Sequence, residues 1–85
     1  MTYKDKLKKI FQYHGLSTQL KKLSEEVFEL QEAILTGNNF ADITTEFADV
    51  MVILNQIKEI YNLDKEEIKD AMKYKIDRQC KRDGI

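Results

Sequence analysis

Apolar residues recur at alternating spacings of three and four along most of the chain, which is the pattern of amphipathic helices. One stripe consists of Leu16, Leu20, Leu23, Val27, Leu30 and Ile34. A second stripe consists of Ile43, Phe47, Val50, Leu54, Ile57 and Tyr61, with Ile53 and Ile60 extending it on one side. These stripes predict two long helices, each of which buries one face.

Residues near the start of the chain predict where the first two helices begin and end. A short helix is expected from about Tyr3 to His14, because Gly15 occupies the position just past a helix C-terminus that glycine favours. Ser17 is expected to cap a second helix, which runs to about Leu35. The chain therefore begins with a short helix followed closely by a long one.

The segment TGNNFAD is the clearest break in the chain. Gly37, Asn38 and Asn39 are residue types that adopt the left-handed conformations found at helix ends. Asp42 can cap a third helix, which is expected to run to about Tyr61. The break thus separates the two long amphipathic helices, so that they can pack antiparallel.

A fourth helix is predicted in the last third of the chain. Asn62 marks the end of the third helix, and Asp64 with Glu67 has the spacing of a capping box. The residues expected to face inward are Ile68, Ala71, Met72 and Ile76. The predicted fold is therefore all-α, a compact antiparallel bundle of about four helices in a single domain spanning residues 1–85.

Composition supports this fold and suggests what reinforces it. The chain has no proline, three glycines and 34% charged residues, which favours long helices. A domain of 85 residues buries a modest fraction of its surface, and Cys80, the single cysteine, cannot form an internal disulfide. We therefore expect a metal or self-association to stabilise it. The lone thiol and the lack of a long apolar segment predict a soluble, cytoplasmic protein away from membranes.

Charge is balanced overall but unevenly distributed. Lys and Arg total 14 against 15 Asp and Glu, so a net charge of −1 gives no indication of nucleic-acid or membrane binding. The basic residues near the C-terminus are Lys73, Lys75, Arg78, Lys81 and Arg82, with Asp77 among them. A basic last helix beside an acidic centre suits an anionic ligand. The basic run also has a simpler interpretation as a solvated helix end favoured by the helix dipole.

Four carboxylates in the two long helices form two acidic pairs. Glu26 and Glu29 are three residues apart, as are Glu46 and Asp49, so each pair lies on one face of its helix. Glu46 falls inside the apolar arc of its helix, and Asp49 lies at the edge of that arc. An ionised carboxylate facing a core is costly unless it is paired, neutralised or bound to a metal. The pattern therefore indicates a cation site.

Simpler interpretations of these acids exist. Acids in the first turn of a helix complement its dipole, which explains Glu46 in part but not Asp49, about two turns in. Glu26 could instead belong to a solvated face with Lys22 as its partner. If the four acids do hold a cation, oxygen ligands without a Cys or His cluster favour Mg²⁺, or Mn²⁺, over zinc. Such an ion could bridge nucleotide phosphates.

The two acidic segments resemble a known family. KLSEEVFELQEAI and EFADVMVIL, with 16 residues between Glu29 and Glu46, are similar to the metal-binding helices of the all-α nucleoside triphosphate pyrophosphohydrolases, the MazG-like group. The resemblance covers about Gln19 to Arg82. It implies a nucleotide pyrophosphohydrolase that uses Mg²⁺ to cleave a nucleoside triphosphate between its α and β phosphates. The products would be a nucleoside monophosphate and pyrophosphate.

The resemblance also assigns residues to roles. Glu26, Glu29, Glu46 and Asp49 would be the metal ligands, and Glu25 with Glu26 would be catalytic, Glu25 orienting or deprotonating the attacking water. The expected substrate-binding residues are Gln19, Lys22, Lys73, Lys75, Asp77 and Arg78. Family members commonly carry a basic residue and, four positions later, an Asn. Lys73 fits this pattern but Asp77 departs from it, so Lys75 or Arg78 could serve instead. The family implies a homodimer or homotetramer.

Two other classes of function stay open from the sequence. One is a small nucleic-acid-binding regulator that reads DNA with the helix from Asp64 to Arg82, although the net charge of −1 makes nucleic acid an improbable partner. The other is a helical interaction module whose acidic pairs are surface residues. Nothing in the sequence chooses among uracil, cytosine and purine triphosphates as substrate.

Overall fold

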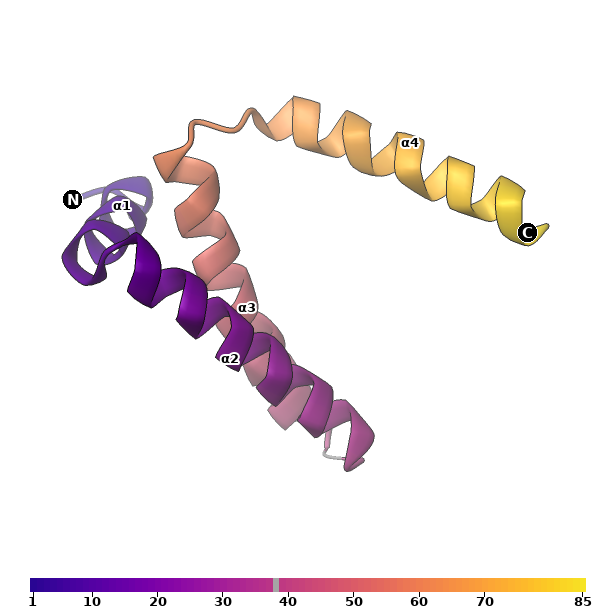
Figure 1. The fold of residues 1–85 in the computed structure, drawn as a ribbon, viewed down its shortest axis with the longest axis horizontal. Helices are drawn as coiled ribbons and strands as arrows, with labels where there is room; N and C mark the ends of the chain where they lie inside the picture. The colour runs from indigo at the N-terminus through magenta and orange to yellow at the C-terminus, as the bar shows by residue number, and fades with distance from the viewer. Residues whose placement is uncertain (38) are drawn as a thin grey trace.

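The computed structural model describes residues 1–37 and 39–85, which fold into helices joined by short turns (Figure 1). The helices are α1 (Tyr3–His14), α2 (Leu16–Leu35), α3 (Phe40–Ile60) and α4 (Lys65–Asp83). The all-α class and the four predicted helices are therefore confirmed within the described residues. Each helix has the length and position that its apolar pattern and flanking residues predict, to within a few residues.

Capping interactions define α1 and the start of α2. Thr2 caps α1, because its hydroxyl accepts the Asp5 backbone N–H at 3.0 Å and its own N–H donates to the Asp5 carboxylate at 3.2 Å. Gly15, at φ 87°, ends α1 and also precedes α2 directly. The prediction that Ser17 caps α2 is wrong. A single glycine with positive φ turns the chain, so α2 begins at Leu16 and Ser17 lies in its first turn.

A similar shift occurs at the start of α3. Asn39 is the cap, because its side-chain oxygen accepts the Asp42 backbone N–H at 3.0 Å. Asp42 was expected to be the cap and instead lies three residues further on, in the first turn. Asn38, also expected to help end α2, lies outside the described residues. Gly37 does adopt a left-handed conformation, with φ 72°.

The end of α3 and the start of α4 follow the prediction. Asn62 has φ 51°, the left-handed conformation expected just past a helix. The Asp64 carboxylate accepts the Glu67 backbone N–H at 3.0 Å and so caps α4. Leu63 donates its backbone N–H to the carbonyl of Lys58 at 3.0 Å. The turn between α3 and α4 is thus held by local hydrogen bonds.

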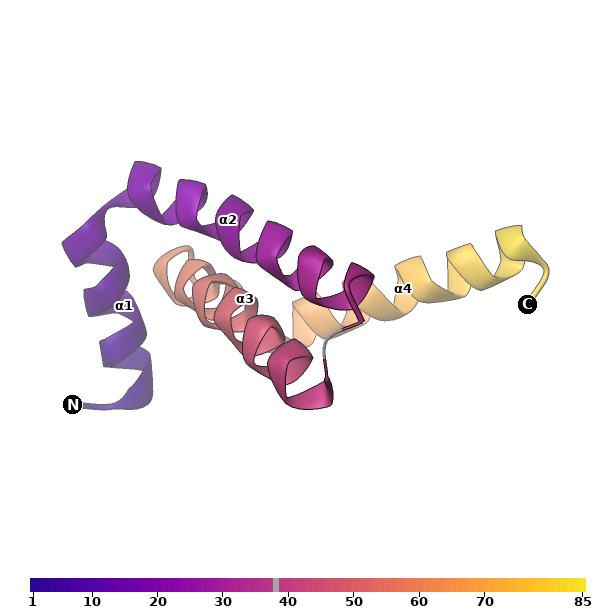
Figure 2. The same cartoon turned by 90° about the horizontal axis from the view of Figure 1, so that it is seen from below.

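Helices α1, α2 and α3 pack on one another, with α2 and α3 antiparallel and side by side (Figures 1 and 2). Helix α1 lies across the end of this pair where α2 begins and α3 ends. The buried apolar side chains are Leu7, Phe11, Ala33, Val50 and Ile53. All of them lie on α1–α3, so the core of the chain is a three-helix unit.

The packed face of α2 is rotated from the predicted stripe. It consists of Gln19, Leu23, Glu26, Leu30 and Ala33, all buried or half-buried. Leu16, Leu20, Val27 and Ile34 were expected in the core and are 37–57% exposed. The small Ala33 is 3% exposed, which shows that this side of α2 is closely covered. The predicted core face was therefore wrong in part: α2 packs through one edge of its wide apolar arc and not through its centre. Leu23 and Leu30 belong to both the predicted and the observed face.

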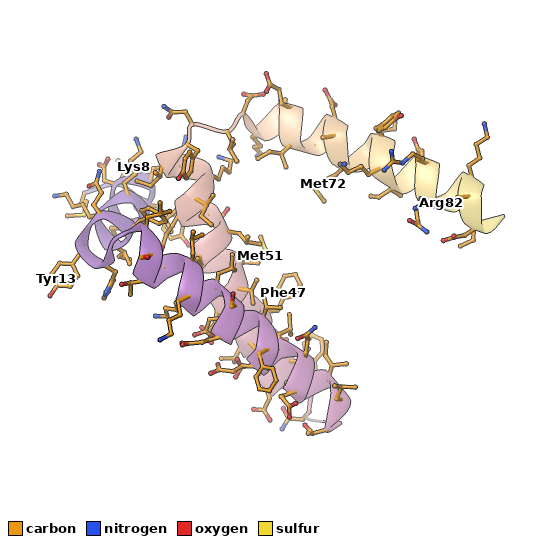
Figure 3. All side chains as sticks on the ribbon, viewed as in Figure 1. Lys8, Tyr13, Phe47, Met51, Met72 and Arg82 are labelled. Carbon is orange, nitrogen blue, oxygen red and sulfur yellow. The ribbon has the colours of Figure 1, made fainter. Side chains whose placement is uncertain are left out.

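Helix α4 extends away from the three-helix unit and makes no contact with it among the described residues (Figure 1). The prediction that its apolar residues face a core is therefore wrong within one chain. Met72 and Ile76 are each 56% exposed, Ala71 is exposed and Ile68 is half-buried. Figure 3 shows Phe47 and Met51 projecting from the helix pair on the side toward which α4 extends.

The chain exposes more surface than a closed domain of its mass. Its accessible surface is 6896 Å², whereas a compact monomer of this size exposes about 5,200 Å². The excess comes from the isolated α4 and the apolar faces it leaves uncovered. None of the described helices combines the length and apolar character that a membrane span requires.

Candidate metal centre

Three carboxylates from two helices meet at the centre of the α2–α3 pair. Glu26 on α2 and Glu46 and Asp49 on α3 each offer an oxygen, and these atoms all lie within 4.8 Å of one another. The antiparallel packing creates this group, because Glu26 and Asp49 lie near the middles of α2 and α3, and Glu46 lies about one turn before Asp49. The structure thus brings together three of the four acids expected to bind a metal.

The surroundings of this group favour a bound cation. Glu26 and Glu46 are half-buried, whereas Asp49 is exposed and keeps one side of the group open to solvent. The Oε2 atoms of Glu26 and Glu46 are buried and have no hydrogen-bond partner in the part of the chain that the structure describes. A buried carboxylate oxygen without a donor is costly. A hard divalent cation would satisfy both oxygens, so these residues fit a Mg²⁺ or Mn²⁺ ion.

Burial and mutual repulsion act on the same two carboxylates. Partial burial raises the pKa of Glu26, and the neighbouring charges of Glu29 and Asp49 raise it further. The pKa of Glu46 is raised by the same causes in the same order, with a further contribution from Asp42. Lys22 opposes the effect at Glu26. The metal-free site therefore carries negative charge that the protein compensates only in part, through Lys22 at Glu26.

Glu29 and Glu25 lie in different settings. Glu29 is exposed but close enough for its charge to act on both Glu26 and Glu46. It therefore borders the three-carboxylate group. Glu25 is exposed and is not a member of this group. Adjacent residues on a helix point about 100° apart, so Glu25 lies to one side of the direction taken by Glu26.

A cavity of about 260 Å³ adjoins the carboxylates. It is lined by Gln19, Lys22, Glu26, Asp49 and Gln56, together with the apolar Ile10, Val52 and Ile53. Two of the six residues expected to bind substrate, Gln19 and Lys22, therefore line the same cavity as two of the expected metal ligands. This cavity is the candidate substrate site.

The other four expected substrate contacts lie elsewhere. Lys73, Lys75, Asp77 and Arg78 are all on α4, which is separate from the carboxylates within one chain. Arg78 lies over the ring of Tyr74, 5.7 Å from its centre, and Lys73 lines an open apolar groove on α4. The structure of one chain therefore does not bring the basic C-terminal residues to the acidic group.

Sequence reasoning missed Gln56, which the structure places in the same cavity. Gln56 is 2% exposed, and its Oε1 accepts a hydrogen bond of 2.9 Å from Nε2 of Gln19. A signal was available, because Gln56 follows Ile53 by three residues and Asp49 by seven, on the packed face of α3. A polar residue on the packed face of a helix, like Glu46, points to a candidate binding site.

The raised pKa values predict an unusual pH dependence for the metal-free protein. A group whose pKa is raised on folding stabilises the fold below its unfolded pKa, here about 4.5, and loses that contribution as pH rises through the folded pKa. The melting temperature in EDTA should therefore rise as pH falls from about 7 toward about 4.5. Circular dichroism melts across this range would test it, and a steady fall in melting temperature would contradict it.

Added Mg²⁺ should reverse this trend, because its ligands must be deprotonated. Below about pH 4.5 acidification should weaken the fold both with and without Mg²⁺, since Asp5 and Glu59 have lowered pKa values. For Asp5 the cause is hydrogen bonds with Thr2, and for Glu59 it is the hydrogen bond with Lys58. A lowered pKa contributes stability that is lost as pH falls through the folded pKa.

The fold and the acidic group agree with what the chain is similar to. The family model described as the MazG nucleotide pyrophosphohydrolase domain matches residues 14–82, which contain the acidic group, every residue lining the cavity except Ile10, and nearly all of α4. No curated protein and no solved structure matches the chain. On the strength of the match over most of its length, the chain belongs to the MazG nucleotide pyrophosphohydrolase family.

Proposed function

We propose that the protein is a Mg²⁺-dependent nucleoside triphosphate pyrophosphohydrolase acting on the cytoplasmic nucleotide pool. It would cleave the bond between the α and β phosphates and release a nucleoside monophosphate and pyrophosphate. The observation that carries this proposal is the group of Glu26, Glu46 and Asp49, with two buried carboxylate oxygens that lack a hydrogen-bond partner among the described residues. It lies within the residues that match the family.

The four acids have distinct parts in this proposal. Glu26, Glu46 and Asp49 would hold Mg²⁺, or Mn²⁺, and Glu29 would complete the ligand set from the edge of the group. The bound ion would supply electrostatic stabilisation of the phosphates and of the leaving group. Glu25, which is exposed beside the group, would accept the proton of the attacking water.

The cavity beside the carboxylates would hold the substrate. Lys22 lines it between the acidic end and Gln19, and its ammonium group would pair with a phosphate oxygen. Ile10, Val52 and Ile53 supply an apolar wall. The charged and apolar parts of a nucleotide would thus meet matching parts of one cavity.

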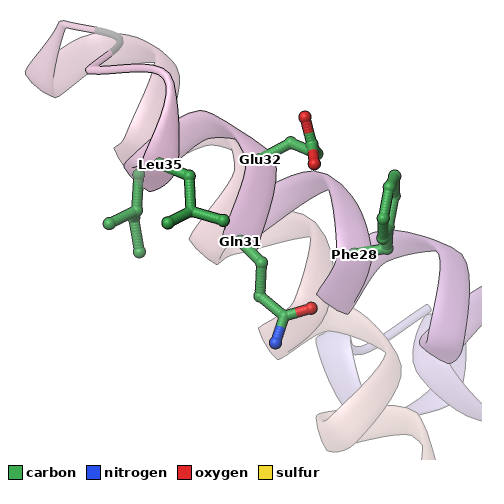
Figure 4. A pocket seen from close by; sticks show the side chains of 5 residues that line it. Phe28, Gln31, Glu32 and Leu35 are labelled. Atoms are coloured by element: carbon green, nitrogen blue, oxygen red, sulfur yellow. The ribbon is translucent and has the colours of Figure 1, made fainter.

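Self-association is part of the proposal, as a homodimer or homotetramer. The accessible surface exceeds that of a compact monomer by about 1,700 Å², while a stable interface buries about 800 Å² on each partner. Phe28 and Leu35 add an exposed apolar strip on the outer side of α2, 59% and 81% exposed (Figure 4). A second copy of the chain would cover such faces and give α4 something to pack against.

A direct test is to incubate the purified protein with Mg²⁺ and a panel of ribo- and deoxyribonucleoside triphosphates and to separate the products by chromatography. Monophosphate and pyrophosphate should appear in equal amounts. EDTA should abolish the reaction, and Mn²⁺ should restore it. Release of inorganic phosphate with a nucleoside diphosphate would contradict the proposed bond, and absence of turnover with any triphosphate would contradict the activity.

A further inference from the structure

The most unusual feature of the cavity is a pair of buried carboxamides. Gln19 and Gln56 are 1% and 2% exposed and are the buried polar side chains of the described chain. They are joined by a hydrogen bond of 2.9 Å from Gln19 Nε2 to Gln56 Oε1. Gln19 Oε1 is buried and has no partner among the described residues. The pair is therefore only partly satisfied by the protein itself.

The unused groups can be counted from carboxamide chemistry. Two carboxamides carry two acceptor oxygens and four N–H groups, and the hydrogen bond between them uses one oxygen and one N–H. One oxygen and three N–H groups are left, whichever way the two amides are oriented. The pair is thus rich in donors, with a single fully unused acceptor. The buried Oε1 of Gln19, unpartnered among the described residues and next to free N–H groups, favours a ligand that can pair with it.

The position of the pair relative to the carboxylates suits a nucleotide. Gln19 is seven residues from Glu26 on α2, and Gln56 is seven residues from Asp49 on α3. Seven residues are about two helical turns, or roughly 10 Å along each helix. Lys22 and Ile53 lie between the two ends, and all of these residues line the same cavity. A phosphate held at the acidic end would therefore place a base, across its sugar, at the carboxamide end.

We propose that Gln19 and Gln56 form a base-reading pair that selects uracil or thymine in the substrate. The imide edge of these bases has one N–H between two carbonyl oxygens, and so offers one donor and two acceptors. It complements a site with one free oxygen and several free N–H groups. Cytosine, adenine and guanine each carry an amino group and so bring two or more N–H groups, against one in uracil or thymine, to a site with a single free oxygen.

This inference rests on the proposed function, and its test separates binding from hydrolysis. The protein, with Mg²⁺, is titrated calorimetrically with α,β-imido triphosphates of uridine, thymidine, cytidine, adenosine and guanosine, which are not cleaved between those phosphates. The uridine or thymidine analogue should bind roughly 100-fold more tightly than the others, the scale expected when a mismatched ligand leaves buried polar groups unpaired.

The matched variant is Gln19→Leu with Gln56→Leu. Replacing both partners of a buried hydrogen bond by apolar residues of similar size is nearly neutral for stability, so the melting temperature should stay close to that of the wild type. The preference among bases should disappear. Gln12→Leu, at an exposed position on α1, is the control and should keep both the melting temperature and the preference.

Each outcome decides one of the two proposals. Equal binding of all bases, a preference for cytosine or a purine, no binding of any analogue, or a preference that survives in a folded double variant would overturn the base-reading role. Analogue binding with the expected preference, together with no cleavage of any natural triphosphate, would overturn the hydrolytic function and leave the base-reading role standing. Cleavage of all triphosphates without preference would overturn the base-reading role and leave the hydrolytic function standing.

Discussion

Replacing Glu46 with glutamine is expected to lower pyrophosphohydrolase activity by at least about 100-fold, the scale on which metal sites respond even to changes around their ligands. The same change should raise the melting temperature of the metal-free protein. Burial and the charges of Glu29 and Asp49 disfavour an ionised carboxylate at Glu46. A neutral amide of nearly the same shape removes that repulsion, and it also removes the ligand charge that a cation needs.

The two effects have to be measured on the same preparations. Melting temperatures are recorded in EDTA and in Mg²⁺. Initial rates are measured with the triphosphate that the wild type cleaves fastest. The wild type should gain stability from Mg²⁺, and the Glu46→Gln protein should gain much less. Glu32→Gln, an exposed change on α2, is the charge-matched control and should behave as the wild type. A variant that is active, or that is destabilised without metal, would show that Glu46 is a structural residue and not a metal ligand.

The helices and the acidic pairs could be predicted because they depend on residues close together in the sequence. Spacings of three and four, glycine at φ 87° after α1 and the Asp64 cap are local signals. The position of Glu46 inside an apolar arc was visible for the same reason, and the structure places it half-buried beside Glu26. The wrong cap predictions at Ser17 and Asp42 arose where more than one neighbouring residue could precede the helix; the structure has Gly15 and Asn39 in those positions.

The packed faces depended on information that spacing does not contain. Apolar residues cover a wide arc on α2, and either edge of that arc could face α3. The edge with Ala33 and Gln19 is the one that packs, and it leaves Leu20 and Ile34 exposed. Gln19 and Gln56 could be recognised as partners from the structure alone, because they are 37 residues apart. Sequence periodicity identifies candidate faces, and packing decides between them.

Helix α4 is involved in both predictions that one chain does not fulfil: the burial of its apolar residues and the approach of its basic residues to the substrate. Its apolar residues were expected to face inward and its basic residues to reach the substrate, yet within one chain it contacts neither the core nor the carboxylates. One explanation accounts for both observations. If a second copy of the chain packs against α4, Met72 and Ile76 become buried and the cations of α4 can approach the acidic group of that second copy.

This explanation predicts that two inactive variants will complement each other. Glu46→Gln removes an acidic ligand and Lys73→Ala with Arg78→Ala removes the cations, so each protein alone should have little activity. The two proteins are mixed in equal amounts, allowed to exchange subunits, and assayed. In a dimer whose sites combine acids of one chain with cations of the other, each mixed dimer has one intact site. Random exchange should therefore restore about a quarter of the wild-type activity.

The same mixture distinguishes the alternatives by its result. If each site is built from one chain, no combination restores an intact site and the mixture stays inactive. Introducing Met72→Glu and Ile76→Glu into both proteins should prevent recovery, because charged residues cannot be buried without a partner in the interface that α4 would form. Sedimentation should then show a smaller assembly than that of the wild type. If the mixture still recovered about a quarter of the wild-type activity with these changes present, the subunits would have to meet through a surface other than Met72 and Ile76. The exposed strip of α2 that contains Phe28 and Leu35 would then be the next surface to test.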